Sequence, residues 1–270
     1  MIHLRSIDYK PPSQHDVFPF NVPVIQSLTT LNLASDVIFL VGENGSGKST
    51  LLEAIACAVE LPVVGSQAAH RDPTLKTVCQ LADCFKLTWN KRTKRGFFMR
   101  SEDYFGFVRR LAGLESEMEA DIAAVDREYT GRSDFAKGLA KMAYVRELNS
   151  MRENYGENGL DSQSHGESYF TLFQSRFVPD GLYLLDEPEA PLSPTRQLTF
   201  LSLLKMAVAQ RAQFIIATHS PILLAYPGAT ILSFHGQQIE QVDYDALEHV
   251  TVMRDFLNNP AAYLRHLMDV

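Results

Sequence analysis

The 270-residue sequence has few cysteines, no long hydrophobic run and no excess of basic residues. Its most apolar long stretch, residues 198–209, is too short to span a bilayer and contains Ser202 and Lys205. The first residues lack the apolar core of a secretory signal, and an odd number of cysteines without such a signal predicts free thiols in a reducing, cytoplasmic environment. These cysteines are Cys57, Cys79 and Cys84. The absences argue against a membrane-spanning chain and a disulfide-dense scaffold.

Acidic residues outnumber basic ones, 32 to 25, which gives a net charge of −7 and excludes a protein coated all over in positive charge. One stretch, residues 86–100, nevertheless contains several basic residues and no acid. They are Lys86, Lys91, Arg92, Lys94, Arg95 and Arg100. This cluster is either an ordinary solvated surface or a patch that binds nucleic acid or an acidic protein partner.

The order of apolar segments predicts an α/β fold. A hydrophobic fraction of 46% and a charged fraction of 21% are typical of a globular protein of one large or two small domains. Short apolar runs typical of buried parallel strands are separated by helical segments, so we expect a mostly parallel core sheet. The expected strands are 1–10, 36–41, 182–185 and 214–217, and the expected helices are 49–60, 195–211 and a C-terminal pair within 253–267 that is broken at Pro260.

Residues 103–160 differ from this core because charged residues of both signs alternate with apolar residues at helical spacing. They predict two or three surface helices, followed by a Gly-, Asn- and Ser-rich loop over 155–167. We therefore expect an α/β core of residues 1–102 and 168–270, with antiparallel N-terminal strands, interrupted by a helical subdomain of residues 103–167.

Residues 42–49 match G-x-x-x-x-G-K-[ST] between an expected buried strand and an expected helix. In this P-loop, glycines let backbone N–H groups surround phosphates, Lys48 reaches the β- and γ-phosphates, and the Ser49 hydroxyl is a ligand of Mg²⁺. The sequence therefore predicts a P-loop nucleotide site that uses ATP and Mg²⁺. The residues expected to bind nucleotide are Gly42, Asn44, Gly45, Ser46, Gly47, Lys48, Ser49 and Thr50.

Two further strand ends carry polar side chains that suit the same chemistry. Asp186 follows the apolar run 182–185 and would hold the Mg²⁺ shell, while Glu187 would act as general base on the attacking water. His219 follows the run 214–217, where it is either a structural histidine or a contact to the γ-phosphate.

These elements, in this order, resemble the ATP-binding-cassette (ABC) ATPase superfamily, including its soluble chromosome-maintenance and recombination-repair relatives. That superfamily has a signature motif, LSGGQ, before the second acidic motif, and residues 164–168 (SHGES) occupy this place, Ser164 being 22 residues before Asp186. The resemblance implies that Ser164 and Gly166 contact the γ-phosphate bound by an opposite subunit, and that Glu167, which stands where the motif has Gln, also binds nucleotide. It therefore implies a homodimer that forms head-to-tail on ATP.

The residues that follow Asp186 and Glu187 narrow the resemblance to one group within the superfamily. Transporter cassettes usually have a DEPTSALD-like string with Asp where Ser193 stands, whereas DEPE followed by Ser-Pro and a later THSP is more similar to soluble AAA-type ATPases of bacteria. The resemblance implies a soluble ATPase that drives a partner or nucleic-acid transaction. The alternatives are the nucleotide-binding subunit of a membrane transporter that works with a permease, and a regulatory module with negligible turnover.

Two further roles expected in such a family have candidates here. Residues 96–103 occupy the place of the glutamine loop, where Glu102 is either a metal-facing sensor or a surface acid at a helix start. For stacking on adenine, Tyr9, Phe18 and Phe20 are candidates, and core packing is the alternative for each.

Overall fold

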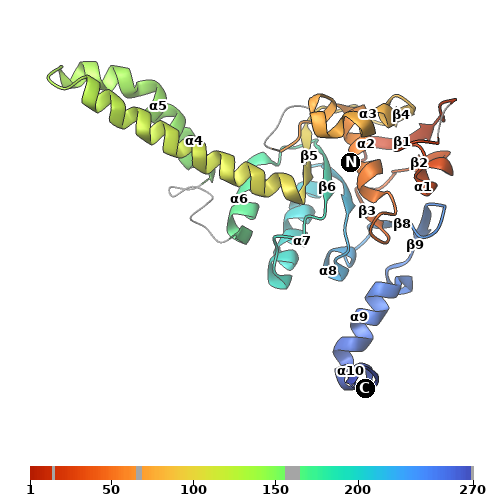
Figure 1. Ribbon diagram of the computed structural model, residues 1–270. Helices are drawn as coiled ribbons and strands as arrows, with labels where there is room; N and C mark the ends of the chain where they lie inside the picture. Colours follow the sequence, from red (N-terminus) through yellow and green to blue (C-terminus); the bar gives the residue numbers. More distant parts are fainter. Residues whose placement is uncertain (14–15, 65–68, 156–164, 269–270) are drawn as a thin grey trace.

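The computed structural model describes residues 1–13, 16–64, 69–155 and 165–268, and a six-stranded sheet forms its centre (Figure 1). All neighbouring strands of this sheet are parallel except the last pair, which confirms the predicted α/β class. In spatial order the strands are β5 (Gly96–Arg100), β6 (Leu182–Asp186), β7 (Gln213–Ala217), β3 (Val37–Val41), β8 (Thr230–Ser233) and β9 (Glu240–Val242). The three central strands are buried on both faces, and therefore their sequences are continuous apolar runs.

Successive side chains of β3 belong to two different hydrophobic clusters. Ile38 and Leu40 belong to one cluster, which includes apolar residues of α2 (Lys48–Val59). Phe39 belongs to the other, which includes Phe200 of α7 (Pro194–Ala209). Because successive strand residues point to opposite faces, these two clusters cover the two sides of the sheet. Both helices begin within one residue of the expected positions.

A smaller antiparallel sheet packs beside the main one. Its strands, in spatial order, are β2 (Thr30–Asn32), β1 (Leu4–Tyr9) and β4 (Phe85–Trp89), and the short helix α1 (Pro23–Gln26) precedes β2. The fully buried amide of Gln213 joins the two sheets: it accepts hydrogen bonds from the backbone N–H of His3 and of Leu4, both at 2.9 Å, and donates to the Leu33 carbonyl at 2.8 Å. Because both the oxygen and the nitrogen of this buried amide are hydrogen-bonded, Gln213 fixes the position of β1 against β7.

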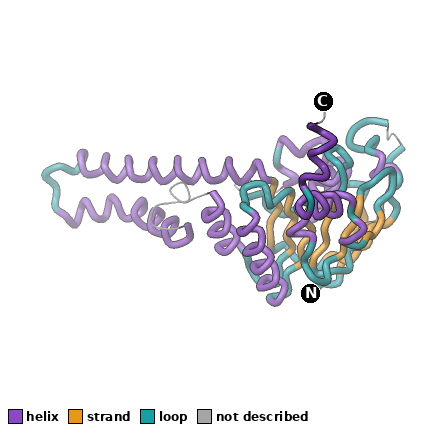
Figure 2. The backbone as a smooth tube through the Cα atoms, turned by 90° about the horizontal axis from the view of Figure 1, so that it is seen from below, coloured by secondary structure: helices purple, strands orange, loops and turns teal. Residues whose placement is uncertain are grey.

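In chain order a helical arm lies between β5 and β6, although these strands are neighbours in the sheet. It consists of α4 (Ser101–Glu128) and α5 (Asp134–Tyr155), which run antiparallel away from the sheets (Figures 1 and 2), and α6 (His165–Arg176) leads back to the core. The helices were expected, but the loop over 155–167 is wrong at its end, because residues 165–167 form the first turn of α6. Residues 156–164 lie outside the described part. The domain division at residues 103 and 168 stays a prediction.

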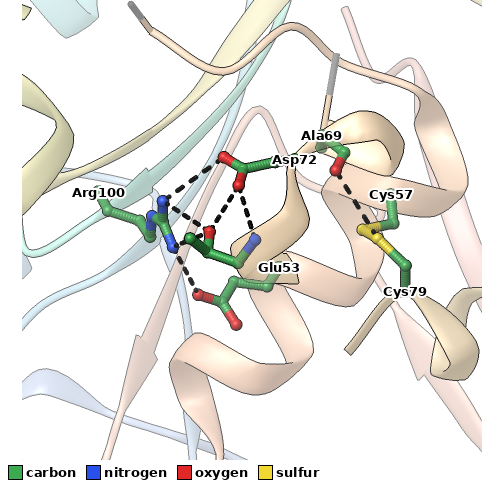
Figure 3. Close-up of a disulfide and its surroundings, with 7 residues drawn as sticks. Glu53, Cys57, Ala69, Asp72, Cys79 and Arg100 are labelled. Atoms are coloured by element: carbon green, nitrogen blue, oxygen red, sulfur yellow. Dashed lines mark hydrogen bonds and ion pairs between the residues drawn. A yellow bond between two sulfur atoms is a disulfide. The ribbon is translucent and has the colours of Figure 1, made fainter. Parts of the chain in front are cut away.

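The prediction of free thiols is wrong for two of the three cysteines. Cys57 of α2 and Cys79 of α3 (Lys76–Ala82) form a disulfide, and Cys84 alone is a free thiol (Figure 3). The two residues are 22 positions apart in the chain, so no motif marks them as a pair. The packing of α3 on α2 brings their Cα atoms to 5.4 Å, the usual distance for a disulfide.

The C-terminal segment is helical, as expected, with a break before Pro260. Here α8 (Pro221–Leu224) follows β7, and α9 (Glu248–Asn258) and α10 (Pro260–Met268) follow β9; the first of this last pair begins earlier than predicted. Three short 3₁₀ turns complete the elements: Ala69–Arg71, Pro73–Leu75 and Tyr244–Ala246. None of the described helices combines the length and apolarity needed to cross a bilayer.

Candidate nucleotide site

The P-loop connects β3 to α2 and depends on glycine. Gly45 and Gly47 have φ angles of +80° and +101°, in the left-handed region where other residues are strained. A Cβ on Gly47 would also lie 2.7 Å from Val22 Cγ1, so this position excludes a side chain on steric grounds. The loop leads directly into the first turn of α2, whose backbone N–H groups have no intrahelical acceptors. This local geometry is suited to binding an anion.

Lys48 is buried and folds back over the loop. Its ammonium Nζ donates hydrogen bonds to the carbonyls of Gly42 at 2.8 Å and Glu43 at 2.9 Å. Burial lowers the pKa of Lys48, and the carboxylates of Asp186 and Glu187 oppose this by favouring the charged form. The cation is therefore held at the loop and next to the acids at the end of β6.

Asp186 ends β6 at the same edge of the sheet, and its side chain is paired with the hydroxyl of Ser49 by a hydrogen bond. Burial raises the pKa of Asp186 to about 6, whereas the Ser49 hydrogen bond lowers it. Its Oδ1 is buried and has no hydrogen-bond partner among the residues described. A hydroxyl beside a carboxylate with a free oxygen fits Mg²⁺, which is commonly held by one or two protein oxygens together with phosphates.

Glu187 follows in a left-handed conformation, with a φ of +50°. This backbone costs on the order of 1–3 kcal/mol and occurs mainly where the surrounding structure imposes it. The N–H of Glu187 donates to the Ala217 carbonyl at 2.8 Å, and its Oε1 lies 4.0 Å from Nε2 of His219. Burial lowers the pKa of His219, which favours the neutral imidazole. The two side chains that follow β6 and β7 thus meet at the sheet edge.

Glu189 also contributes to this edge, although the sequence analysis gave it no role. Its Oε1 accepts a hydrogen bond from the backbone N–H of His219 at 2.8 Å, and the Thr218 side chain is bonded to the same carboxylate. Burial raises the pKa of Glu189, and these two hydrogen bonds lower it. Glu189 therefore fixes the loop that carries His219. The sequence does carry one signal for Glu189, because it is the last acidic residue of the DEPE string, residues 186–189.

Arg100, the last residue of the basic cluster found in the sequence, lies at the end of β5 in register with Asp186. Its guanidinium bonds to Asp103 at 2.9 Å and lies 3.6 Å from Glu53 and 3.8 Å from Asp72 (Figure 3). Burial raises the pKa of Glu53 to about 7, against the opposing effect of Arg100. Arg100 therefore contacts the first turn of the arm, the P-loop helix α2 and the segment before α3.

Beside Arg100, the first turn of α4 contacts the acidic motif directly. The Ser101 hydroxyl donates to the carbonyls of Asp186 at 3.1 Å and Glu187 at 2.5 Å. The Glu102 carboxylate is 74% exposed and lies 3.4 Å from Arg100, at the helix start. Its role as a metal-facing sensor stays a prediction, whereas Ser101 links the arm to the candidate site by hydrogen bonds.

The remaining candidates divide between described and undescribed parts. Ser164 lies outside the described residues, and Gly166 and Glu167 lie in the first turn of α6, so their contact to a nucleotide stays a prediction. Tyr9 and Phe20 are buried in the hydrophobic cluster that includes α2. Phe18 is 49% exposed and is the adenine-stacking candidate with an accessible ring.

Much of the charge in the basic stretch is compensated within the chain. Lys94 pairs with Glu60 at 2.7 Å, Lys91 lies 3.2 Å from Asp180, and the partly buried Arg100 is surrounded by acids as described above. Lys86, Arg92 and Arg95 are exposed. Residues 90–95 precede β5, and the P-loop follows the parallel strand β3, so they lie at opposite edges of the main sheet. Any patch here is smaller than the sequence indicates, and its part at residues 90–95 is separate from the nucleotide site.

The parallel sheet, the glycine-dependent P-loop and the acids at the end of β6 define a P-loop nucleotide-binding protein of the ABC ATPase type. A family model described as "AAA domain" matches residues 19–165, more than half of the chain. A second, "AAA domain, putative AbiEii toxin, Type IV TA system", matches residues 163–225. The chain belongs to the AAA domain family, within the ABC-type ATPase superfamily, and is an ATPase.

Two curated proteins are similar at low identity. The macrolide export ATP-binding/permease protein MacB of Acinetobacter baylyi is 26% identical over 210 residues, covering 75% of this chain and 28% of MacB. The cobalt import ATP-binding protein CbiO of Salmonella typhimurium is 25% identical over 203 residues, covering 74% of this chain and 67% of CbiO. The chain thus spans little more than a quarter of the first relative, and these names assign it no transport role.

Solved structures are similar at lower identity still. The Smc head domain of Pyrococcus furiosus, solved with an extended coiled coil and bound to a domain of ScpA, has a TM-score of 0.45 and 11% identity, covering 95% of this chain and 100% of that one. A nucleotide-free ATP-binding cassette from an ABC transporter has a TM-score of 0.46 and 14% identity, covering 97% and 99%.

Proposed function

We propose that this chain binds Mg-ATP at its P-loop and hydrolyses it at a head-to-tail dimer interface, and that this cycle drives a partner protein or a nucleic-acid transaction. The observation that carries the proposal is the convergence at one sheet edge of groups from three separate segments. Lys48 and Ser49 begin α2, Asp186 ends β6 with Glu187 directly after it, and His219 follows β7. Dimerisation rests on the resemblance of residues 164–168 to the signature motif.

In the proposed reaction the loop N–H groups and the Lys48 ammonium bind the phosphates. Ser49 and the free oxygen of Asp186 would hold Mg²⁺, which, when bound, supplies neutralising charge to the phosphate oxygens. Glu187 orients a water molecule and accepts its proton as the water oxygen bonds to the γ-phosphorus and the bond to the β-phosphate oxygen breaks. His219 lies close enough to Glu187 to fix its carboxylate and to contact the γ-phosphate.

The experiment that tests this assignment is the substitution Glu187→Gln, which keeps the shape of the side chain but removes the base. We expect ATP hydrolysis to fall by about 10²- to 10⁴-fold, while ATP binding is retained and an ATP-bound dimer accumulates. Phosphate release measures the first effect, and light scattering coupled to size exclusion measures the second. Glu128→Gln, at the exposed end of α4, is the matched control and should hydrolyse at the normal rate.

Hydrolysis by Glu187→Gln at the rate of the unsubstituted protein would remove Glu187 from the mechanism. Loss of hydrolysis together with loss of ATP binding would instead indicate a damaged loop, which calorimetry with ATP distinguishes. A variant that binds ATP, turns over slowly and stays monomeric would leave the chemistry in place and overturn the head-to-tail dimer.

A further inference from the structure

The helix α5 packs on α4 through one of its faces. Lys141 of α5 pairs with Asp126 of α4 at 2.5 Å, and Arg152 pairs with Glu115 at 3.2 Å. Leu148, which lies between these two cations in the sequence, is buried. These three α5 residues are seven and four positions apart and therefore share a helix face. This face is the one through which α5 completes the antiparallel arm.

A second, neighbouring face of α5 is apolar and open to solvent. Phe135 is 81% exposed, Leu139 and Met142 are each 60% exposed, and Val145 is 38% exposed. Their spacing of four, three and three residues defines one stripe, which we call the outer stripe. An open groove of about 780 Å³ runs beside it, lined in part by Met142 and Val145. Among the described residues α5 packs on α4 and α6, yet these four side chains stay exposed, so the stripe is available to a further packing partner.

The charges of the arm disfavour an anionic partner. The helix α4 contains eight acidic and three basic residues, a net charge of −5, and α5 contains three acidic and four basic residues, a net charge of +1. An anionic lipid surface or a nucleic acid would be repelled by the acids of α4. A second α5, itself slightly basic, is compatible with the acidic helix beside it.

The outer stripe is also complementary to a copy of itself. If two α5 helices pair antiparallel around a two-fold axis between residues 140 and 141, Leu139 of one copy faces Met142 of the other. The same register sets Arg146, which lies on this face, opposite the exposed ring of Phe135. A guanidinium over an aromatic face is attractive by about 0.5–2 kcal/mol. Each Lys141 near the axis is already neutralised by its own Asp126.

We propose that the outer stripe of α5 is a dimerisation surface whose partner is the same stripe of a second copy of this chain, paired antiparallel. Two arms joined in this way form a four-helix bundle, in which the second pair of helices covers the apolar face that one arm leaves exposed. The interface is isologous, because the same residues contribute from both copies. It is separate from the P-loop edge and does not depend on the proposed ATP-bound dimer.

The test is the association state of the full chain without nucleotide. Sedimentation equilibrium should show a monomer–dimer equilibrium, and the double substitution Leu139→Glu, Met142→Glu should weaken it by at least about 100-fold, since two central apolar contacts are lost. The matched control is Leu198→Glu, Met206→Glu on α7, where the side chains are 57% and 61% exposed; it should dimerise normally. All four residues lie on the surface, and circular dichroism checks that each variant is folded.

The register has its own test. Arg146→Ala should weaken the dimer about tenfold, and Arg146→Lys should recover part of the loss, because an ammonium also interacts with an aromatic ring. A nucleotide-free chain that stays monomeric up to about 100 μM overturns the proposal, including when the stripe instead binds anionic vesicles. A dimer unaffected by the Leu139 and Met142 substitutions also overturns it. A dimer weakened by them but indifferent to Arg146→Ala overturns the register.

Discussion

At the scale of the residue, Asp186 shows how burial prepares a metal ligand at a cost in stability. Its carboxylate is removed from water at the end of β6, with one oxygen left without a partner among the described residues. Burial therefore favours the protonated form, and the pKa of Asp186 rises from 3.8 to about 6. A cation supplied next to this oxygen would relieve the penalty, which is why such a group suits a site that is filled only during function.

This shift predicts that Asp186→Asn stabilises the nucleotide-free protein. Because the folded pKa is raised, the stabilising contribution of protonated Asp186 is present below its unfolded pKa and is lost as pH rises through about 6. The neutral amide avoids this loss, so at pH 8 we expect a gain of about 3 kcal/mol in the free energy of unfolding, which disappears below about pH 4. Urea titrations at the two pH values measure it.

The same variant should lose Mg²⁺-dependent hydrolysis, since an amide is a poor ligand for this ion. Asp121→Asn, at an exposed position of α4, is the control and should change neither property. A variant that is destabilised equally at both pH values would mean that the Asp186 carboxylate is held by favourable contacts in the folded protein.

At the scale of the element, the position of α3 depends on α2. The disulfide joins these helices, and the chain just before α3 supplies Asp72, which lies 3.8 Å from Arg100 (Figure 3). Arg100 in turn bonds to the first turn of α4, and Ser101 contacts the end of β6. A series of direct contacts therefore links the P-loop helix, the acidic motif and the base of the arm.

Reduction of the Cys57–Cys79 disulfide should lower the stability of the protein measurably. Closing a loop with a separation of 22 residues contributes about 3 kcal/mol, chiefly by restricting the unfolded chain. We expect a reductant to lower the melting temperature of the unsubstituted protein and of Cys84→Ser alike. Cys57→Ala, Cys79→Ala should melt at the lower temperature with and without reductant. Equal melting of all these proteins under both conditions would contradict the contribution of the bond.

At the scale of the whole molecule, the main sheet separates the candidate nucleotide edge from Arg92 and Arg95, which precede β5. Lys86, Arg92 and Arg95 are exposed, whereas Lys91 and Lys94 are paired with acids of the same chain. A nucleic acid bound through Arg92 and Arg95 would therefore lie away from the P-loop, and any coupling to ATP would pass through the body of the protein.

If nucleic acid is the partner, replacing Lys86, Arg92 and Arg95 by alanine should weaken DNA binding equally for all DNA sequences. Loss of three phosphate contacts should reduce the slope of log affinity against log salt by about 3. Fluorescence anisotropy with duplex DNA at several salt concentrations measures the slope. Lys10→Ala, Lys76→Ala, Lys205→Ala changes the net charge equally at other exposed positions and is the control. An identical loss in both triple variants would indicate a general charge effect and no patch.

The sequence by itself determined the P-loop, the acidic strand end and the α/β class, because each depends on local features: glycine freedom, strand burial and the spacing of polar residues along a few consecutive positions. Only the tertiary structure decided the pairing of Cys57 with Cys79, the contact of Glu189 with the loop of His219, and the meeting of α2 and α4 at Arg100. These contacts join residues from 3 to 47 positions apart. Apart from Glu189, the last residue of the DEPE string, no motif marks them, and they form because packed helices and parallel strands bring particular side chains within bonding distance. The outer stripe of α5 has the same origin, since its spacing is legible in the sequence but its exposure follows from which face α4 covers.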